Sequence, residues 1–210
     1  MKADGSRTDV PAYCYYNMFN DCSSLTQAPE LPATTLASFC YGGMFYNCTS
    51  LTSAPKLPAT TLAGHCYSGM FHGCTSLTSA PELPATTLAD YCYDNMFYNC
   101  ISLTSAPELP ATTLANGCYS EMFNYCSNLS SINVSFTTWN LTNSTTRWVN
   151  GVAASGTFTC PAELPDTRGA SNIPEGWTKS DSSYPTSNLL MHFDGINNTG
   201  AGDASHSTDT

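Results

Sequence analysis

Ten of the eleven cysteines in this chain lie on a grid with a spacing of 26 residues. A pair of cysteines eight positions apart recurs five times, and only Cys160 stands outside the grid. The grid positions are Cys14, Cys22, Cys40, Cys48, Cys66, Cys74, Cys92, Cys100, Cys118 and Cys126. A fixed period of this length, with leucines at fixed offsets, is typical of a solenoid in which each repeat forms one coil stacked on the next.

Each repeat contains the motif C-Y-x-x-M-F-x-x-C, which predicts a short amphipathic helix. Counted from the first cysteine, positions 0, +1, +4, +5 and +8 are constant, whereas positions +2, +3, +6 and +7 vary. On a helix these two sets occupy opposite faces, so the constant residues are expected in the core. Besides the grid cysteines, the predicted core contains Met44, Phe45, Met70, Phe71, Met96 and Phe97.

The segment after the second cysteine, S-L-T-S-A-P-E-L-P, predicts a short strand at about residues 51–54 of the second repeat. Pro55 and Pro58 are expected to end it, because proline cannot donate a hydrogen bond to a sheet. Each coil would thus be a strand, a proline turn and a short helix. The predicted fold class is an α/β repeat solenoid, leucine-rich-repeat-like, with a small β-rich C-terminal cap.

The repeats define four sections of the chain. Residues 1–9 form a lead-in, 10–136 the five-coil solenoid, 137–185 a β-rich cap, and 186–210 a tail or the truncated start of a lectin-like domain. A cap is expected because a solenoid leaves the apolar edge of its last coil bare. Trp148 and Trp177 are predicted to lie in the cap core; the alternative is an aromatic platform for carbohydrate. Both chain ends are expected to be cuts through a longer modular protein.

Composition excludes several classes of function. The net charge of −10 and the isoelectric point near 4.4 argue against a nucleic-acid partner, because phosphate binding needs clustered Lys and Arg. No run of about 18 apolar residues is present, so no membrane insertion is expected. Residues 1–12 lack the apolar segment of a signal peptide.

The sequence predicts no cofactor, no metal site and no catalytic residues, so the chain is not expected to be an enzyme. The spacing C-x7-C does not match the short cysteine spacing of structural zinc sites. His65 and His72 are expected to be surface variants of the repeat and not metal ligands. No Ser-His-Asp order, Gly-rich phosphate loop or isolated activated cysteine is recognisable.

The sequence is compatible with three arrangements of the cysteines: disulfides within a coil, disulfides between coils, and free thiols. On a straight helix, positions 0 and +8 lie about 12 Å apart along the axis, whereas a disulfide needs Cα atoms within about 7 Å. Disulfides within a coil therefore require a broken helix, and pairing between equivalent cysteines of neighbouring coils leaves one of five unpaired. The favoured prediction is two columns of buried free thiols that act as small apolar residues.

The repeat M-F-x-x-C-T-S-L-T-S-x-P-x-L-P resembles the BspA-type leucine-rich repeat proteins of bacterial surfaces, especially the cysteine-bearing Bacteroidetes variety. The resemblance covers about residues 10–136. Met-Phe stands where the family has Ala-Phe, and Ala-Pro replaces two strand apolar residues. The segment L-L-M-H-F-D-G near the C-terminus resembles the opening strand of a concanavalin A-like or laminin-G-like module. The family resemblance implies adhesion and binding of host proteins, and hence an extracellular or cell-surface location.

The leading functional hypothesis is a non-enzymatic binding or adhesion module that displays the variable repeat positions to a protein or carbohydrate ligand. Tyr and Asn side chains suit such a surface because they make adaptable contacts. The candidate ligand-binding residues are Tyr16, Tyr46, His72, Asp94, Tyr98, Glu121 and Tyr125. The alternative is a structural component of a phage tail or surface filament, which would place the chain on a virion. A catalytic module beyond Thr210 in a parent protein is a third possibility.

Overall fold

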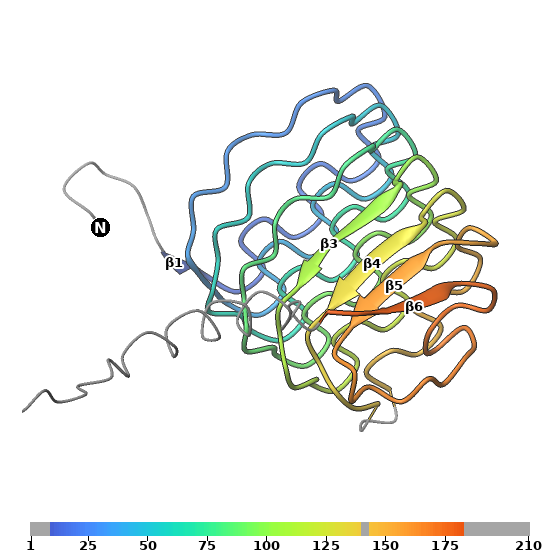
Figure 1. Ribbon diagram of the computed structural model, residues 1–210. Coiled ribbons are helices and arrows are strands. Elements are labelled where there is room, and N and C mark those ends of the chain that lie inside the picture. The colour runs from blue at the N-terminus through green and yellow to red at the C-terminus, as the bar shows by residue number, and fades with distance from the viewer. Residues whose placement is uncertain (1–8, 140–142, 183–210) are drawn as a thin grey trace, which may run out of the picture.

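The computed structural model describes residues 9–139 and 143–182. The chain winds in coils of 26 residues that lie one on the next from the N-terminal to the C-terminal end (Figure 1). The amide of Tyr15, for example, donates to the carbonyl of Cys40 at 2.9 Å, and that of Tyr41 donates to Cys66 at 3.0 Å. The coils are called here coil 1 (13–38), coil 2 (39–64), coil 3 (65–90), coil 4 (91–116) and coil 5 (117–142).

The predicted helix in each repeat is wrong, and with it the α/β solenoid with one helix per coil. The part of the chain that the structure describes contains no helix. The C-Y-x-x-M-F-x-x-C motif instead forms a row of overlapping tight turns, called here a turn segment. In coil 1 the amides of Tyr16 and Met18 donate to the carbonyls three residues earlier. The alternating amides of Tyr15, Asn17 and Phe19 donate to carbonyls of coil 2. About half of the backbone amides in a turn segment thus bond to the next coil and hold the stack together.

The backbone dihedrals explain why the turn segment is not helical. Every fourth residue has a positive φ: in coil 1 these are Tyr13 at 58°, Asn17 at 55° and Asp21 at 60°. A positive φ at the third position is what a type II turn requires, and a right-handed helix cannot contain it. In coils 2–4 two of the three equivalent positions hold Asn or Gly, the residues that adopt this conformation most readily.

Regular strands are short and concentrate toward the C-terminal end. β1 (Asp9–Val10) pairs with β2 (Thr35–Leu36), and a four-stranded parallel sheet has the order β3-β4-β5-β6 (Figure 1). Its strands are β3 (Ser105–Leu109), β4 (Ser131–Val134), β5 (Thr157–Cys160) and β6 (Thr178–Asp181).

The strand predicted at residues 51–54 is reduced to isolated bridges. Ser53 forms single parallel bridges to Gln27 and Ser79. Prolines two and five positions after these residues, such as Pro55 and Pro58, remove amide donors and stop the ladder. β3 nevertheless contains Pro107, because its partner β4 has no proline and supplies the amides; the register shifts next to Pro107.

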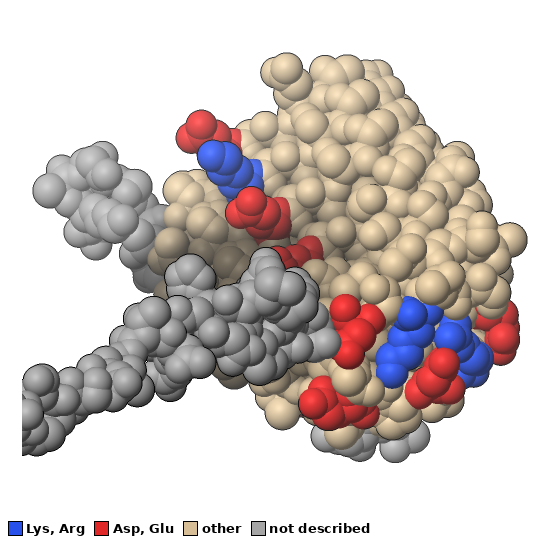
Figure 2. All heavy atoms as spheres, in the orientation of Figure 1, with Lys and Arg blue, Asp and Glu red and all other residues tan. Residues whose placement is uncertain are grey.

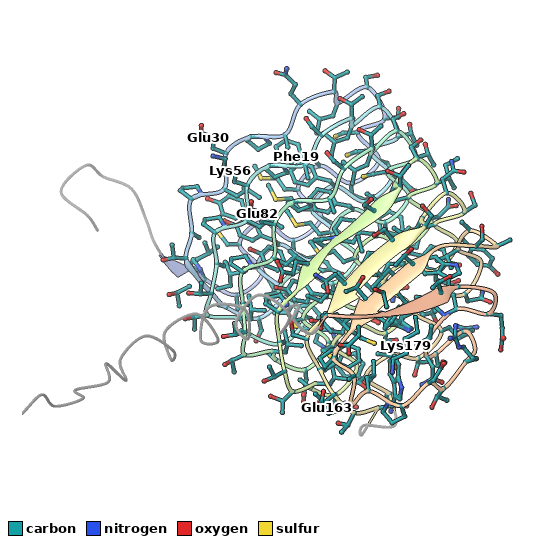
Figure 3. The ribbon with its side chains drawn as sticks, viewed as in Figure 1. Phe19, Glu30, Lys56, Glu82, Glu163 and Lys179 are labelled. Carbon is teal, nitrogen blue, oxygen red and sulfur yellow. The ribbon has the colours of Figure 1, made fainter. Side chains whose placement is uncertain are left out.

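The core consists of columns of identical side chains, one from each coil. The rings of Phe45, Phe71 and Phe97 are fully buried and stack with centroids 5.6 Å apart. Figure 3 shows Phe19 at the N-terminal end of this column. Met44, Met70, Met96 and the grid cysteines of coils 2–5 are buried as predicted. Cys14 and Cys22 are exposed, contrary to the prediction, because no described coil covers coil 1.

The stacking continues beyond residue 136, the expected end of the repeats. A sixth turn segment accepts hydrogen bonds from coil 5, for instance from the amide of Phe123 to the carbonyl of Trp148 at 2.8 Å. β5 pairs with β4 at the same offset of 26 residues, from Ser131 to Thr157. The expected tail or lectin-like strand at 186–210 lies outside the described residues, as does nearly all of the lead-in at 1–9.

Charged side chains gather in two places on the face seen in Figure 2. One is the column that contains Glu30, Lys56 and Glu82, which are labelled in Figure 3. The other lies at the C-terminal end, where Lys179 is labelled. The rest of this face is largely uncharged. In residues 9–139 and 143–182 there is no helix long and apolar enough to cross a membrane.

Candidate functional site

Two columns of stacked aromatic rings run along the outer face of the turn segments. The first, wall A, consists of Tyr13, Phe39, His65 and Tyr91, with successive ring centroids 4.8, 4.4 and 4.8 Å apart. The second, wall B, consists of Tyr46, His72 and Tyr98, with centroids 4.3 and 4.4 Å apart. Interplanar angles of 0–11° keep the rings parallel, so each wall presents ring edges to its sides.

All four residues of wall A adopt a left-handed backbone conformation, with φ between 55° and 58°. Aromatic residues rarely adopt this conformation, and it costs roughly 1–2 kcal/mol at a residue with a side chain. Coil 5 has glycine, Gly117, at the same position. In coils 2–4 the other two positive-φ positions of each turn segment hold only Asn or Gly. The aromatic side chains of wall A are therefore retained against a local backbone preference for glycine.

A shallow groove of about 390 Å³ lies between the two walls. Wall A contributes Phe39, and wall B contributes Tyr46 and His72. The residues that line the groove come from coils 1–4 and are Tyr16, Asn17, Asn20, Phe39, Gly43, Tyr46, Ser68, Gly69, His72 and Asn95. The groove therefore follows the direction of stacking.

The lack of a side chain at Gly69 keeps the groove open. Gly43 and Gly69 have φ values of 59° and 60°, but Asn17 and Asn95 adopt 55° at the equivalent positions of coils 1 and 4. Glycine is therefore not needed for the backbone conformation. A Cβ atom added at Gly69 would meet only Tyr46, at 4.0 Å, so a side chain there has room to project into the groove.

Tyr16 lies across the N-terminal end of the groove. Its ring is nearly perpendicular to that of Phe39, at 79°, with the centroids 6.2 Å apart. Its edge passes over Gly42, where a Cβ atom would lie 3.1 Å from the ring. The rings of Phe39 and His72 are each stacked on both faces, whereas Tyr16 is nearly perpendicular to its aromatic neighbours, has no ring stacked parallel to it and is 47% exposed. Tyr16 therefore offers a ring face to a ligand.

The groove is electrically neutral around pH 7. No Lys, Arg, Asp or Glu lines it. Burial between two tyrosine rings lowers the pKa of His72 below its ordinary value, and the more distant Glu121 only partly opposes this. Next to the groove, Asp94 accepts a hydrogen bond from Ser68 at 3.4 Å, and burial raises the pKa of its carboxyl group.

The structure divides the seven predicted ligand-binding residues into two sets. Tyr16, Tyr46 and His72 line the groove, whereas the other four do not. Tyr98 continues wall B and touches the edge of Tyr125, with the ring centroids 5.6 Å apart. Glu121 forms an ion pair with Arg147 and accepts a hydrogen bond from Asn124.

Sequence reasoning missed wall A, although its signal was present. Tyr13, Phe39, His65 and Tyr91 are aromatic at one offset in four consecutive repeats, directly before the first cysteine. His65 was interpreted as a surface variant; it is half-buried between Phe39 and Tyr91.

The tryptophans of the C-terminal part lie in the core, as predicted, and form no carbohydrate platform. Trp148 is fully buried and its indole N–H donates to the carbonyl of Asn172 at 2.9 Å. Trp177 is also buried and donates to Ala153 at 2.7 Å. Their polar atoms are thus satisfied inside the protein.

The eleven cysteines are free thiols, and nine of them are buried. Burial raises the pKa of Cys66 and of Cys74 to about 12, which suppresses the reactive thiolate. Within the described ranges, no three His, Cys, Asp or Glu side chains are grouped so that they could hold a metal ion. The groove, with its aromatic walls and amide side chains, is suited to binding.

Comparison with known proteins does not assign the chain to a family. No protein-family model matches it, and no curated protein or solved structure matches it either.

Proposed function

We propose that the chain is a non-enzymatic binding module, of the kind found in adhesins, whose ligand site is the groove between walls A and B. The observation that carries this proposal is the left-handed conformation of four stacked aromatic residues at wall A. Their retention at positions that favour glycine is explained if the walls make contact with a ligand. An extracellular or cell-surface location and the resemblance to BspA-type repeat proteins are consistent with this role.

A variant with a changed groove tests the proposal. Tyr16→Ser, Tyr46→Asn and His72→Asn each introduce a residue that the same position already holds in another coil, at Ser68, Asn20 and Asn124. The triple variant should therefore fold. The wild-type chain and the variant are compared on an array of glycans and extracellular-matrix proteins. We expect wild-type binding that the variant loses; binding by neither chain, or equal binding by both, contradicts the proposal.

A structural role in a phage tail or surface filament is the second candidate, and the N-terminal edge of the stack favours it. The carbonyls of Cys14, Tyr16, Met18 and Asn20 accept no hydrogen bond from any described residue, although their counterparts in coil 2 accept one from coil 1. Met18 at this edge is 58% exposed. Such an edge suits the addition of another coil with the same repeat.

Sedimentation velocity of the purified chain at increasing concentration tests the structural role. A filament component should form larger species as the concentration rises, and Met18→Lys should suppress them by placing a charge on the apolar edge. A monomer at all concentrations argues against this second candidate and leaves the groove proposal untouched.

A further inference from the structure

The geometry points to a linear, uncharged oligosaccharide as the occupant of the groove between walls A and B. This inference rests on the proposed binding function and specifies the chemical class of its ligand. Four features of the groove support it. The groove carries no charge, asparagine side chains in it have free amide groups, the backbone amides beneath it are already hydrogen-bonded, and the ring of Tyr16 has an exposed face.

The neutrality of the groove excludes ligands that depend on charge. An acidic ligand would need Lys or Arg, and neither lines the groove. A cationic ligand would need a carboxylate or an aromatic cage, but no Asp or Glu lines the groove and the nearby Asp94 is bonded to Ser68. The rings of Phe39 and His72 are covered on both faces, so the open face of Tyr16 does not become a cage. The net charge of −10 also opposes anionic polymers at long range.

Amide side chains in the groove match the hydroxyl groups of a sugar. Asn17 and Asn20 line the groove, and the described residues offer their side-chain amides no hydrogen bond. An amide both donates and accepts, as a hydroxyl group does, so each can pair with a sugar hydroxyl in either direction. Asn95 lines the groove from coil 4, and Ser68 adds a hydroxyl group from coil 3.

The backbone beneath the groove disfavours an extended peptide. The amides of Asn17, Gly43 and Gly69 already donate to the carbonyls of Gly42, Ser68 and Asp94 in the following coils, at 2.8–2.9 Å. A peptide that binds as an added strand needs a row of unpaired backbone groups. The amides beneath the groove are therefore unavailable to a peptide, and the unpaired carbonyls of Tyr16 and Asn20 lie only at the N-terminal edge of the stack, so the groove recognises its ligand chiefly through side chains.

Tyr16 supplies the flat surface on which a sugar ring can lie. Its ring stands at 79° to Phe39 and is not stacked. The groove continues from Tyr16 across the edges of Phe39, Tyr46 and His72 to Asn95. Since successive coils are spaced by about 4.8 Å, the three steps from coil 1 to coil 4 span roughly 14 Å, which suits a linear chain of several sugar units.

Calorimetry and NMR titration with defined oligosaccharides test this inference on the intact chain. The neutral probes are linear cello-, chito-, manno- and galacto-oligosaccharides, and the acidic probes are heparin and hyaluronan oligosaccharides. Tyr16→Ala should weaken binding of the neutral probe about three- to tenfold through lost stacking. Gly69→Glu should weaken it by about tenfold or more, because the long side chain occupies the groove. Glu121, with a φ of 51° at the equivalent position of coil 5, shows that this backbone position accepts glutamate.

Tyr125→Ala is the matched control. Tyr125 is 50% exposed, close to the 47% of Tyr16, and lies on the same outer face, but it does not line the groove. Its replacement should leave affinity unchanged. Neutral-probe binding that is insensitive to Tyr16→Ala and Gly69→Glu overturns the inference, as does tighter binding of the acidic probes.

The outcomes also separate this inference from the function on which it rests. If the chain binds a matrix protein through the groove but none of the oligosaccharides, the carbohydrate inference is overturned and the binding function stands. If it binds neither class of ligand, both are overturned.

Discussion

At the second cysteine of each repeat, hydrogen bonding and packing favour the same type of side chain. The thiol of Cys74 donates to the carbonyl of Phe45 at 3.1 Å, and that carbonyl also accepts the amide of Cys48. The same contact recurs from Cys48 to Phe19, from Cys100 to Phe71 and from Cys126 to Phe97. Cysteine combines a small apolar volume with a weak donor, which this site between two coils requires.

Thiol reactivity should follow the position of each coil in the stack. Burial raises the pKa of Cys48 to about 11 and that of Cys126 to about 12, so at pH 7.5 these thiols are protonated as well as inaccessible. We expect brief treatment of the native protein with iodoacetamide to modify Cys14 and Cys22, and unfolding in guanidinium chloride to release the other nine. Mass spectrometry of the intact and digested protein counts them. Rapid modification of Cys74 in the native state would show that the core is open.

His72 should make stability depend on pH in a definite direction. Its pKa is lowered in the folded protein by burial between Tyr46 and Tyr98. The unfolded chain, with an ordinary histidine pKa of about 6.5, therefore takes up a proton before the folded chain does. The stability present above pH 6.5 is then lost as the pH falls below that value. Denaturant midpoints at pH 7.5 and 5.5 should fall further for the wild type than for His72→Asn; an equal fall in both contradicts this.

At the scale of elements, the turn segment depends on residues that tolerate a positive φ at every fourth position. Asn99, with a φ of 58°, is one of them, and its amide donates to Asn124 at 2.8 Å. Asn99→Val places a β-branched side chain in the left-handed region and should destabilise the protein by roughly 1–2 kcal/mol. Asn99→Gly should be nearly neutral, because Gly73 fills the same position in coil 3.

Urea unfolding followed by fluorescence measures both variants against the wild type. A helical turn segment would give the opposite order, because glycine costs a helix interior more than valine does. The pair of variants therefore distinguishes the two backbone conformations by the sign of the difference between them.

The turn segment also shows which part of the fold the sequence could predict. The positions of the core residues follow from the constant offsets 0, +1, +4, +5 and +8 under either geometry, so Met70 and Phe71 are buried as expected. The backbone conformation does not follow from these offsets, because a spacing of four residues fits a helix of 3.6 residues per turn almost as well as a row of turns. Asn and Gly at offsets +3 and +7 carried the distinguishing signal.

The strands and the groove form between neighbouring repeats, so the sequence of a single repeat does not predict them. Pro55 was expected to end a strand, yet its counterpart Pro107 in coil 4 lies inside β3, since the neighbouring β4 supplies the amides. The groove forms only when Phe39 and Tyr46 of one coil align with His65 and His72 of the next. The variable positions indicated the face on which a ligand site lies, while the stacking geometry selected Tyr16, Tyr46 and His72 from the seven candidates.

At the scale of the whole molecule, the stack has a direction that comes from its hydrogen bonds. In the turn segments, each coil donates amides to the carbonyls of the following coil, as Gly69 does to Asp94 and Phe97 to Met122. The core columns repeat the same side chain at each step, so any coil presents a matching surface to any other. Stability in such an array is close to a sum over coils and their interfaces.

Removal of one whole coil should therefore leave a folded protein, whereas removal of a slightly shorter segment should not. Deletion of coil 4, residues 91–116, places Phe71 of coil 3 against Phe123 of coil 5 and restores all the core columns. Deletion of residues 91–114 leaves two extra residues, which moves Tyr and Phe out of the core columns. We expect the first variant to unfold cooperatively at a lower temperature than the wild type, because it has lost one interface. The second should show no cooperative transition in calorimetry. Equal behaviour of the two deletions would mean that the 26-residue register does not determine the fold.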